Sequence, residues 1–563
     1  MKLTGAQILC ESLLKEGIKV MFGIPGGVLL PFYDTLPEYP KLHHVLCRHE
    51  QGAAHAAEGY ARACGKVGVC IATSGPGATN LVTGIASAYM DSAPVVAITG
   101  QVSRPFIGKD AFQEVDITGV TLPITKHNYL VTSAHEVATV VKEAFHIADT
   151  GRPGPVLIDI PSDVMSEETE FHYPEKVNLQ GYKPTVKGHP AQVKKAARFI
   201  KESKRPLIIA GKGVINSGAS AELKEFAEKA QIPVVNTLLG LGGFPGTHVL
   251  CLGMIGMHGL AHANMAVNAA DLIIAIGMRF DDRATATVAG FAPDAQVIHI
   301  DIDPAEIGKN VRVDVPIVGD AKNVLKSLNA EVESQNHIEW LSQIEQWERE
   351  HPPLWMRESK TVLPQYVVRQ IYEVTNGNAI IVTDVGQNQM FAAHYFKYDR
   401  PNTFISSGGL GPMGFALPGA MGAKAACSKE NVWCIAGDGG FQMTLQELAT
   451  IVQEKLAVKI AILNNGYLGM VRQWQQLFFG KRYVATPLPG PDFVKLAEAY
   501  GIAGERVTDR VMVTTAIEKA MAHEGPYLID FQVEPEENVF PMVRKGSVIT
   551  DMIEEVRKEA RRR

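Results

Sequence analysis

The stretch VWCIAGDGG (432–440), followed by TLQELATIVQEKL (444–456) and VKIAILNNG (458–466), determines the fold that we expect for the C-terminal part of the chain. Two apolar runs of strand length flank a segment with the apolar periodicity of an amphipathic helix. This order predicts a right-handed βαβ unit, in which the carboxyl ends of both strands lie at the same edge of a parallel sheet. Asp438 and Asn464–Asn465 follow the two strands, so we expect them to converge at that edge.

The same alternation of apolar strands and helical stretches occurs along most of the chain. Further predicted strands are VGVCIAT (67–73), APVVAIT (93–99), RPLIIAGKG (205–213), IPVVNTL (232–238), DLIIAIGMRF (271–280), AQVIHIDID (295–303), NAIIVTDVG (378–386) and PYLIDFQV (526–533). Continuously apolar strands joined by helices are typical of parallel sheets that are covered on both faces. The fold class is therefore α/β, with three doubly wound parallel-sheet domains.

Changes in composition suggest where these domains begin and end. The segment ETEFHYPEKVNLQGYKPTVKGHP (168–190) loses the periodicity and gains proline, glycine and charge, which predicts a linker. A polar segment that contains tryptophan separates the second domain from the third. We therefore predict domains over 1–167, 190–329 and 364–535, and a C-terminal tail over 536–563.

Composition favours a globular protein that binds small molecules and other protein chains. The 563 residues are 46% hydrophobic and 20% charged, and the formal net charge is -6, so electrostatics give no reason to expect nucleic acid. The basic end RKEARRR (557–563) is interpreted as a solvated helix end rather than a membrane or nucleic-acid contact.

Cysteine usage and hydropathy indicate the compartment. The seven cysteines are scattered, odd in number and without a Cys-x-x-Cys pair, which argues against a disulfide framework and a zinc site. The start MKLTGAQILCESLLKEG (1–17) lacks the apolar run of a signal peptide, and no stretch is long enough to predict a membrane span. We expect a cytoplasmic protein.

The strand ends at Asp438 and Asn465 have the chemistry of a magnesium site. Carboxylate, amide and backbone carbonyl oxygens suit a hard divalent cation, which usually also takes oxygens from a bound phosphate. Gly437, Gly439 and Gly440 would let the backbone approach that phosphate. Either motif alone could be only a tight turn at the end of a strand, but the two together on consecutive strands favour a functional site.

The pair GDG and NN, separated by one helix, resembles the diphosphate-binding motif of thiamine-diphosphate enzymes. The resemblance implies that Asp438 and Asn465 bind Mg²⁺ through their side chains and that Tyr467 does so through its carbonyl oxygen. Such enzymes decarboxylate 2-keto acids with a cofactor that accepts the electrons, because no amino-acid side chain can delocalise the resulting carbanion.

Three N-terminal segments extend the resemblance to the pyrimidine-binding domain of the acetohydroxyacid synthases. These are MFGIPGGVLLPFYD (21–34), CRHEQGAAHAAEGYAR (47–62) and ATSGPGATNLVTGI (72–85). In isolation Glu50 could be only a first-turn carboxylate favoured by the helix dipole. The resemblance instead makes it the buried proton carrier of the aminopyrimidine ring. It also implies catalytic roles for Gly23 and Gln113.

Matches in TDVGQNQMFAA (383–393) and GGLGPMGFALPGA (408–420) imply further contacts with thiamine diphosphate. Met413 would support the bent conformation of the cofactor. Asn388 stands where the family more often has histidine, and it could still donate to a phosphate oxygen. The implied cofactor-binding residues are Pro76, Asn80, Val385, Gly386, Gln387, Asn388, Gly411, Met413, Gly437, Gly439 and Gly440.

The middle domain resembles the FAD-binding part of the biosynthetic synthases. AGKGVINSG (210–218) fails the dinucleotide fingerprint, because Asn216 replaces its third glycine. The resemblance rests instead on LGMIGMHGLAHAN (252–264), IGMRFDDRATA (276–286) and VIHIDIDPAEIG (297–308). The residues that would contact a flavin used without net redox chemistry are Arg152, His258, Arg279, Asp301 and Asp320.

GYLGMVRQWQQLFF (466–479) places Met470 and Trp474 on one face if the segment is helical, beside the cofactor. On the pattern alone, Trp474 is more often a packing residue. The resemblance implies that the substrate contacts are Phe112, Met257, Arg283, Met470 and Trp474, with Arg283 on the carboxylate of the second keto acid. Ser162 stands where the family usually has a lysine near the substrate channel.

The resemblance covers residues 3 to about 547 and implies an acetolactate synthase. Such an enzyme decarboxylates pyruvate and joins the two-carbon unit to pyruvate or 2-ketobutyrate, in branched-chain amino-acid biosynthesis. Expected cofactors are thiamine diphosphate, Mg²⁺ and FAD. Expected partners are 2-keto acids, a second copy of the chain in a homodimer or homotetramer with sites at the subunit interface, and a regulatory small subunit. The alternatives are a flavin-dependent pyruvate oxidase and a non-catalytic sensor with the same fold.

Overall fold

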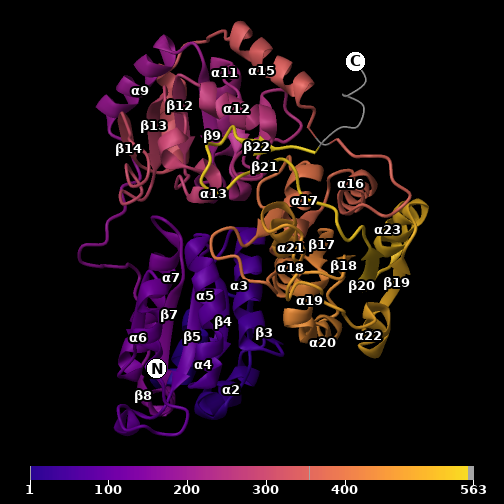
Figure 1. The fold of residues 1–563 in the computed structure, drawn as a ribbon. Coiled ribbons are helices and arrows are strands. Elements are labelled where there is room, and N and C mark those ends of the chain that lie inside the picture. The colour runs from indigo at the N-terminus through magenta and orange to yellow at the C-terminus, as the bar shows by residue number, and fades with distance from the viewer. Residues whose placement is uncertain (1, 354, 556–563) are drawn as a thin grey trace. The chain divides into compact units, whose positions relative to one another are not determined.

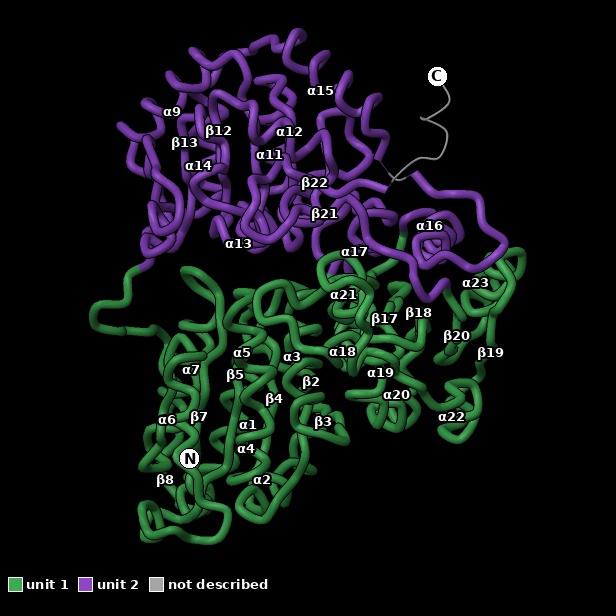
Figure 2. The backbone as a smooth tube through the Cα atoms, in the orientation of Figure 1, with its two compact units in different colours: residues 1–183, 378–388, 405–533 green, residues 184–377, 389–404, 534–563 purple. Residues whose placement is uncertain are grey.

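The computed structural model describes residues 2–353 and 355–555 and divides the chain into two compact units (Figure 2). Unit 1 comprises Met1–Lys183, Asn378–Asn388 and Ile405–Val533, and unit 2 comprises Pro184–Gly377, Gln389–Phe404 and Glu534–Arg563. Three six-stranded sheets form the framework of these units, and the parallel register of their strands confirms the predicted α/β class (Figure 1). The domain boundaries inferred from composition remain a prediction.

The N-terminal sheet of unit 1 has the strand order β3-β2-β4-β5-β7-β6. Its strands are β2 (Val20–Gly23), β3 (His43–Leu46), β4 (Gly68–Ala72), β5 (Val95–Gln101), β6 (His127–Leu130) and β7 (Val156–Pro161). Its helices are α1 (Gly5–Lys15), α2 (Leu30–Thr35), α3 (Glu50–Cys64), α4 (Pro76–Asn80), α5 (Val82–Met90), α6 (Ile117–Thr121), α7 (Ala134–Asp149) and α8 (Ser162–Ser166).

The segment predicted as a linker begins with a short strand. β8 (Glu168–Glu170) pairs antiparallel with β1 (Lys2–Thr4), so the first residues of the segment belong to unit 1. The prediction missed this strand because a three-residue strand is too short to show a periodicity.

The second sheet of unit 1 has the order β16-β15-β17-β18-β20-β19. Its strands are β15 (Ile380–Thr383), β16 (Phe404–Ser406), β17 (Val432–Gly437), β18 (Val458–Asn464), β19 (Ala503–Val507) and β20 (Tyr527–Gln532). The helices in this part of the chain are α17 (Gln387–Tyr395), α18 (Ala416–Ala426), α19 (Asp438–Thr444), α20 (Leu448–Gln453), α21 (Gly469–Phe478), α22 (Phe493–Ala499) and α23 (Val513–Ala522).

The helix expected over 444–456 is broken. α19 ends at Thr444, a 3₁₀ turn spans Leu445–Glu447, and α20 follows. The turn carries Glu447, which is fully buried and accepts hydrogen bonds from the backbone N–H groups of Arg48 and His49 at 3.0 Å each. The apolar periodicity contains no sign of this tertiary contact, so it predicted one uninterrupted helix.

The two sheets of unit 1 share one hydrophobic core, and α3 packs directly on α18. Both helices are rich in alanine and glycine, which lets their backbones approach closely. A Cβ atom at Gly59 would lie 2.1 Å from the Gly419 carbonyl oxygen, and one at Gly422 would lie 1.9 Å from the Ala56 carbonyl oxygen. Glycine is therefore required at both positions by the closeness of the two helices.

The sheet of unit 2 has the order β11-β10-β9-β12-β13-β14. Its strands are β9 (Pro206–Ala210), β10 (Val234–Asn236), β11 (Cys251–Met254), β12 (Leu272–Ile276), β13 (Gln296–Asp301) and β14 (Val315–Val318). The helices of this unit include α9 (Pro190–Glu202), α10 (Lys212–Asn216), α11 (Ser220–Ala230), α12 (Ala261–Ala269), α13 (Asp282–Thr285), α14 (Ala321–Glu331), α15 (Ile338–Glu350) and α16 (Pro364–Thr375).

The C-terminal tail belongs to unit 2, where β21 (Met542–Val543) pairs with β22 (Met552–Ile553). The basic end over 557–563 lies outside the described residues. Among the helices in the described part of the chain, none is long and apolar enough to cross a bilayer.

Candidate active site

Asp438 and Asn465 meet at the carboxyl edge of the second sheet, as the strand order predicts. β17 and β18 run in parallel register up to Gly437 and Leu463, so the residues that follow them emerge together. The backbone N–H of Asn465 donates to Asp438 Oδ1 at 3.3 Å, and the N–H of Tyr467 donates to Asn465 Oδ1 at 3.0 Å. The three residues that the sequence assigns to Mg²⁺ therefore form one cluster.

The Asp438 carboxylate is buried and incompletely paired. Its exposure is 1%, and Oδ2 has no hydrogen-bond partner among the described residues. Burial raises the pKa of Asp438 to about 7, because desolvation penalises the charged form. Such a carboxylate is suited to a cation, which would supply the missing partner for Oδ2 and compensate the buried charge.

Within the described ranges, no group of three or more His, Cys, Asp and Glu side chains could hold a metal ion. A cation at Asp438 would therefore take most of its oxygens from other sources, namely the Asn465 amide, a backbone carbonyl and the ligand. Mg²⁺ that is bound together with a substrate or cofactor phosphate has this kind of ligand set. The residues present fit a magnesium–diphosphate group.

Three segments surround Asp438 and form a glycine-lined cradle. Asp384 is fully buried and accepts hydrogen bonds from the N–H groups of Val385 at 2.8 Å and Gly414 at 3.0 Å. A Cβ at Gly440 would lie 2.6 Å from Asp384 Cγ, and one at Gly439 would lie 3.3 Å from Met413 Cε. Segments 384–388, 411–416 and 437–440 thus converge, which brings the predicted diphosphate residues together.

Gly411 completes this cradle, since a Cβ there would lie 3.5 Å from Val385 Cγ1. Its φ of 73° is in the left-handed region, as is the φ of 131° at Gly386, so both positions favour glycine. Sequence reasoning did not select Asp384 as a site residue, although its place directly after β15 matches that of Asp438 after β17.

Gln387 and Asn388 make different contacts in this cradle. Gln387 Oε1 accepts from Asn465 Nδ2 at 3.3 Å, and Gln387 Nε2 donates to Gln473 Oε1 at 2.8 Å. Asn388 Nδ2 donates to the carbonyl oxygens of Asp384 and Ile435 at 2.7 and 3.2 Å. Its amide nitrogen therefore anchors the backbone, and its contact with a phosphate remains a prediction.

The pyrimidine-side residues lie together at the carboxyl edge of the N-terminal sheet. Glu50 is the first residue of α3 and is half-buried. Asn80 Nδ2 donates to Glu50 Oε2 at 2.9 Å, and a Cβ at Gly77 would lie 3.4 Å from Glu50 Oε1. Pro76 begins α4 beside them. The structure thus brings Glu50, Pro76 and Asn80 into one group.

Gly23 and Gln113 border this group. Gly23 ends β2, and a Cβ there would lie 2.2 Å from the Ile71 carbonyl oxygen. Gln113 has a φ of 60°, and its carbonyl oxygen would lie 2.8 Å from a Cβ at Gly75. Phe112 is 89% exposed in this single chain, so its predicted substrate contact has no counterpart within unit 1.

Met470 and Trp474 both lie on α21, which confirms that this segment is helical. The helix begins at Gly469, and a Cβ there would lie 2.3 Å from Gln387 Oε1 and 2.7 Å from Asn465 Nδ2. The helix therefore starts at the edge of the diphosphate cluster. The Trp474 ring packs edge-on against Phe478 with centroids 5.5 Å apart.

The remaining predicted substrate residues, Met257 and Arg283, are neighbours in unit 2. The Met257 N–H donates to the Arg283 carbonyl oxygen at 2.7 Å, and Arg283 Nη1 lies 3.1 Å from Met257 Sδ. His258 follows and is 9% exposed, with no hydrogen-bond partner for Nδ1 in the part of the chain that is described. Burial lowers the pKa of His258 to about 3, so its imidazole is neutral.

Most of the residues assigned to a flavin follow strands of unit 2. Arg279 follows β12, Asp301 ends β13, and Asp320 is the N-cap of α14, where its side chain accepts from the Asn323 N–H. Arg152 belongs to unit 1, where its Nε donates to Ser92 Oγ at 2.9 Å. Ser162 is also in unit 1, and its hydroxyl pairs with that of Ser103 at 2.8 Å.

The Glu50 group and the Asp438 cluster both lie in regions that match known family domains. Residues 3–120 match the thiamine pyrophosphate enzyme N-terminal TPP binding domain, residues 193–328 match the central domain, and residues 384–531 match the C-terminal TPP binding domain. These matches cover well over half of the chain, which belongs to the thiamine pyrophosphate enzymes.

Curated relatives narrow the class further. The chain is 51% identical to the probable acetolactate synthase large subunit of Methanocaldococcus jannaschii, over 99% of this chain and 96% of that protein. It is 49% identical to the acetolactate synthase large subunit of Corynebacterium glutamicum, over 98% and 90% of the two chains. It is 44% identical to that of Buchnera aphidicola, over 98% of both. Within its class, the chain belongs to the acetolactate synthase large-subunit family, which confirms the resemblance predicted from the motifs.

Proposed function

We propose that this chain is the catalytic subunit of an acetolactate synthase, which decarboxylates pyruvate and condenses the two-carbon unit with a second 2-keto acid. The observation that carries the proposal is the buried Asp438 carboxylate, whose Oδ2 has no partner among the residues described and which meets Asn465 within a glycine-lined cradle. Such a site is shaped for a metal-bound diphosphate. Thiamine diphosphate, when bound, supplies the electron sink that decarboxylation requires.

Asp438, Asn465 and the Tyr467 carbonyl hold Mg²⁺ in this proposal, and the glycines of segments 384–388, 411–414 and 437–440 admit the diphosphate. Among these three proposed ligands Asp438 alone carries a charge, so cation and diphosphate bind together. The Asn388 side chain supports the cradle by donating to two backbone carbonyls.

Glu50 is the proton carrier of the reaction. Its carboxyl group is held by Asn80, which donates to Oε2 and leaves Oε1 available for a proton shared with the aminopyrimidine ring. A fixed carboxyl at the start of α3 can hold and return this proton repeatedly without loss of orientation. Gly23 and Gln113 border the same cluster and contribute backbone contacts.

The second keto acid is bound by Arg283 through its carboxylate and by Trp474, Met470, Met257 and Phe112 through its side chain. A guanidinium can bind a carboxylate with two parallel hydrogen bonds, which fixes the orientation of the substrate. Trp474 and Met470 lie on one helix, α21, next to the diphosphate cluster, so they present apolar surface close to the reacting atoms.

The proposal includes FAD in unit 2. Gly211 and Gly213 approach Gly277 so closely that a Cβ at either glycine would lie within 2.6 Å of its backbone, which leaves a glycine-lined edge after β9 and β12. Arg279 and Asp301 lie at or near the ends of the adjacent strands. The His258 ring is neutral, and its Nδ1 has no hydrogen-bond partner among the described residues. That nitrogen could therefore bond to a flavin.

The complete assembly would place the Glu50 cluster of one subunit against the diphosphate cluster of another, in a cytoplasmic homodimer or homotetramer. A regulatory small subunit would bind this catalytic chain, since the relatives are named large subunits. The pyrimidine-binding, FAD-associated and diphosphate-binding domains would span 1–167, 190–329 and 364–535.

The deciding experiment incubates the purified protein with pyruvate, thiamine diphosphate and Mg²⁺ and assays for acetolactate. We expect acetolactate from the wild-type chain and none from Asp438→Ala, in which calorimetry should also show loss of Mg²⁺-dependent cofactor binding. A flavin that pyruvate bleaches and an acceptor reoxidises at turnover rates would identify a pyruvate oxidase instead. Cofactor binding without any turnover would favour a sensor.

A further inference from the structure

A buried group of three charged side chains lies where α3, α5 and the loop 406–411 meet. Glu58, Arg62 and Asp91 are 0%, 3% and 1% exposed. Arg62 Nη1 donates to Glu58 Oε1 at 3.2 Å and to Asp91 Oδ2 at 3.1 Å. We call these three residues the buried ion triad.

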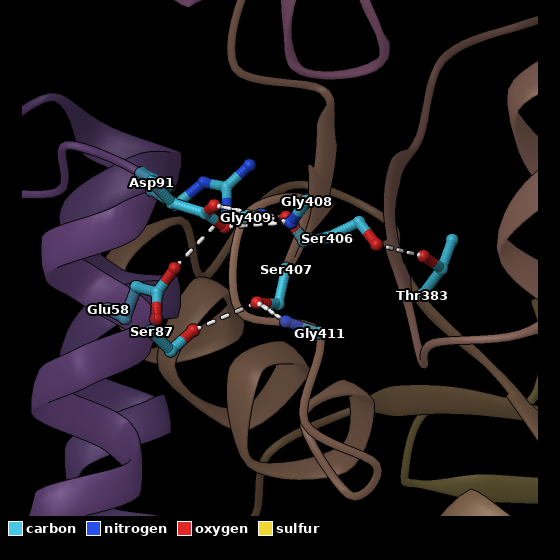
Figure 3. Close-up of polar contacts among 10 residues, drawn as sticks. Glu58, Ser87, Asp91, Thr383, Ser406, Ser407, Gly408, Gly409 and Gly411 are labelled. Carbon is cyan, nitrogen blue, oxygen red and sulfur yellow. Dashed lines mark hydrogen bonds and ion pairs between the residues drawn. The ribbon is translucent and has the colours of Figure 1, made fainter. Parts of the chain in front are cut away.

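The triad is bonded to the backbone of the loop 406–411. Arg62 Nη1 also donates to the Ser406 carbonyl oxygen at 2.7 Å. Asp91 accepts from the Gly409 N–H at 2.7 Å through Oδ1 and from the Gly408 N–H at 3.0 Å through Oδ2. Figure 3 shows Glu58 and Asp91 on the helical side of these contacts and the glycines on the loop.

Two serines make a second bridge to the same loop. The hydroxyl groups of Ser87, from α5, and Ser407 lie 3.0 Å apart, and Ser407 Oγ accepts from the Gly411 N–H at 3.2 Å (Figure 3). The contacts between helices and loop thus extend from Ser406 to Gly409, and Ser407 connects them to Gly411 within the loop. The loop continues into Met413 and Gly414, which belong to the diphosphate cradle.

Burial of the triad costs free energy, because charged groups lose their hydration. Two carboxylates and one guanidinium are removed from water, and Arg62 Nε and Nη2 have no hydrogen-bond partner among the described residues. Asp91 also follows the last residue of α5, where the helix dipole disfavours a negative charge. Burial and the neighbouring Asp91 carboxylate raise the pKa of Glu58. Close by, α3 and α18 pack through one uncharged hydrophobic core, so adhesion between the sheets does not require these charges.

The loop, in contrast, requires bonds to its backbone. Gly408, Gly409 and Gly411 have no side chains to pack, and a glycine-rich segment loses much conformational entropy when it is ordered. Charged acceptors and donors bind backbone groups more strongly than neutral ones do. The side chain of Asp91 supplies such bonds to two consecutive glycines.

We propose that Asp91 and Arg62 are positioning residues for thiamine diphosphate: they hold the loop 406–411 so that Gly411 and Met413 reach the cofactor. This inference rests on the proposed function, because it takes the cradle as the diphosphate site. Neither residue touches the cradle directly. Both act through the loop backbone, and Ser407 adds the last bond before Gly411.

The test compares the dissociation constant for thiamine diphosphate, measured by calorimetry of the full chain with Mg²⁺, at a temperature where every variant is folded. Asp91→Asn removes the charge at nearly constant shape and should weaken cofactor binding about 10–100-fold, the range for loss of a residue that supports a metal ligand. The matched control is Asp159→Asn, since Asp159 is also buried but accepts from Thr99 and Gln101. This control should leave cofactor affinity unchanged.

A second pair of variants keeps the test decisive if Asp91→Asn does not fold. Ser87→Ala and Ser407→Ala both lose the bond between the two serines. Ser87→Ala also loses a hydrogen bond to Glu58 on the helical side, whereas only Ser407→Ala loses the bond to Gly411. Ser407→Ala should therefore weaken cofactor binding more than Ser87→Ala does. A lower unfolding midpoint with unchanged cofactor affinity in Asp91→Asn and Ser407→Ala would overturn the inference and leave a purely structural triad. Failure of the wild-type chain itself to bind thiamine diphosphate would instead overturn the proposed function.

Discussion

Gly422→Ala should destabilise unit 1, because the added Cβ would lie 1.9 Å from the Ala56 carbonyl oxygen and 2.9 Å from Ala56 Cα. Ordinary van der Waals contact begins at 3.4 Å, so the two backbones would have to separate by about 1.5 Å. The obstacle is the backbone of α3, which cannot rotate away as a long side chain could.

Overpacking in a dense core typically costs about 1–3 kcal/mol, and a clash between two backbones should lie at the upper end of that range. Alanine gains about 1 kcal/mol over glycine in helix propensity, which offsets part of the cost. We therefore expect a net loss of about 2 kcal/mol and a fall of roughly 4 °C in the unfolding midpoint.

Thermal unfolding of the purified chain, followed by circular dichroism, is the assay. Gly27→Ala is the matched control, since no atom lies within 4 Å of a Cβ there and its φ is not in the left-handed region. It should leave the midpoint nearly unchanged. A Gly422→Ala midpoint equal to that of the control would mean that the two helices separate at no cost, and the close-packing argument would be refuted.

Glu50→Gln should keep the fold but slow C2 proton exchange of bound thiamine diphosphate about 100-fold or more, because glutamine still accepts from Asn80 but cannot carry the proton; an unchanged exchange rate would remove Glu50 from this role. Trp474→Leu should leave acetolactate formation from pyruvate largely intact and cut the preference for 2-ketobutyrate, since contact with one methylene is worth about 10–200-fold. A competition assay of both keto acids checks it, and equal loss of both products would indicate a packing role. Burial raises the pKa of Asp159 to about 7. The protonated carboxyl therefore contributes fully to stability at a pH below the ordinary pKa of aspartate, and this contribution is lost as the pH rises through 7. Asp159→Asn should therefore reduce the fall in unfolding midpoint between pH 5 and pH 8, and an unaltered pH dependence would contradict the assignment.

The strands and the meeting of the predicted Mg²⁺ ligands could be predicted, because both depend on short-range patterns. Each apolar run that predicted a strand corresponds to one, from VGVCIAT at β4 to PYLIDFQV at β20. Parallel strands place their carboxyl ends at one edge, so Asp438 and Asn465 could be brought together by counting along the chain. Their contact depends on one βαβ unit of fewer than 35 residues.

Elements that depend on distant partners could not be predicted in this way. The break after Thr444 accommodates Glu447, whose partners Arg48 and His49 are about 400 residues away in sequence. A residue-by-residue pattern contains no information about such a contact. Asp384 follows β15 as Asp438 follows β17, so a strand-end carboxylate can belong to the site without standing in a GDG motif.

The amino-acid sequence by itself determined the α/β class, the three parallel sheets, the family and the edge at which Asp438 meets Asn465. Apolar periodicity and strand-end motifs are local, and local patterns are sufficient for these features. Only the tertiary structure revealed that residues 378–388 and 405–533 form one unit with residues 1–183. Only it revealed that Arg62 and Asp91 bind the loop 406–411, more than 300 residues away. Both features, like the packing of α3 on α18, depend on contacts between segments that are far apart in the chain, and no pattern within either segment contains them.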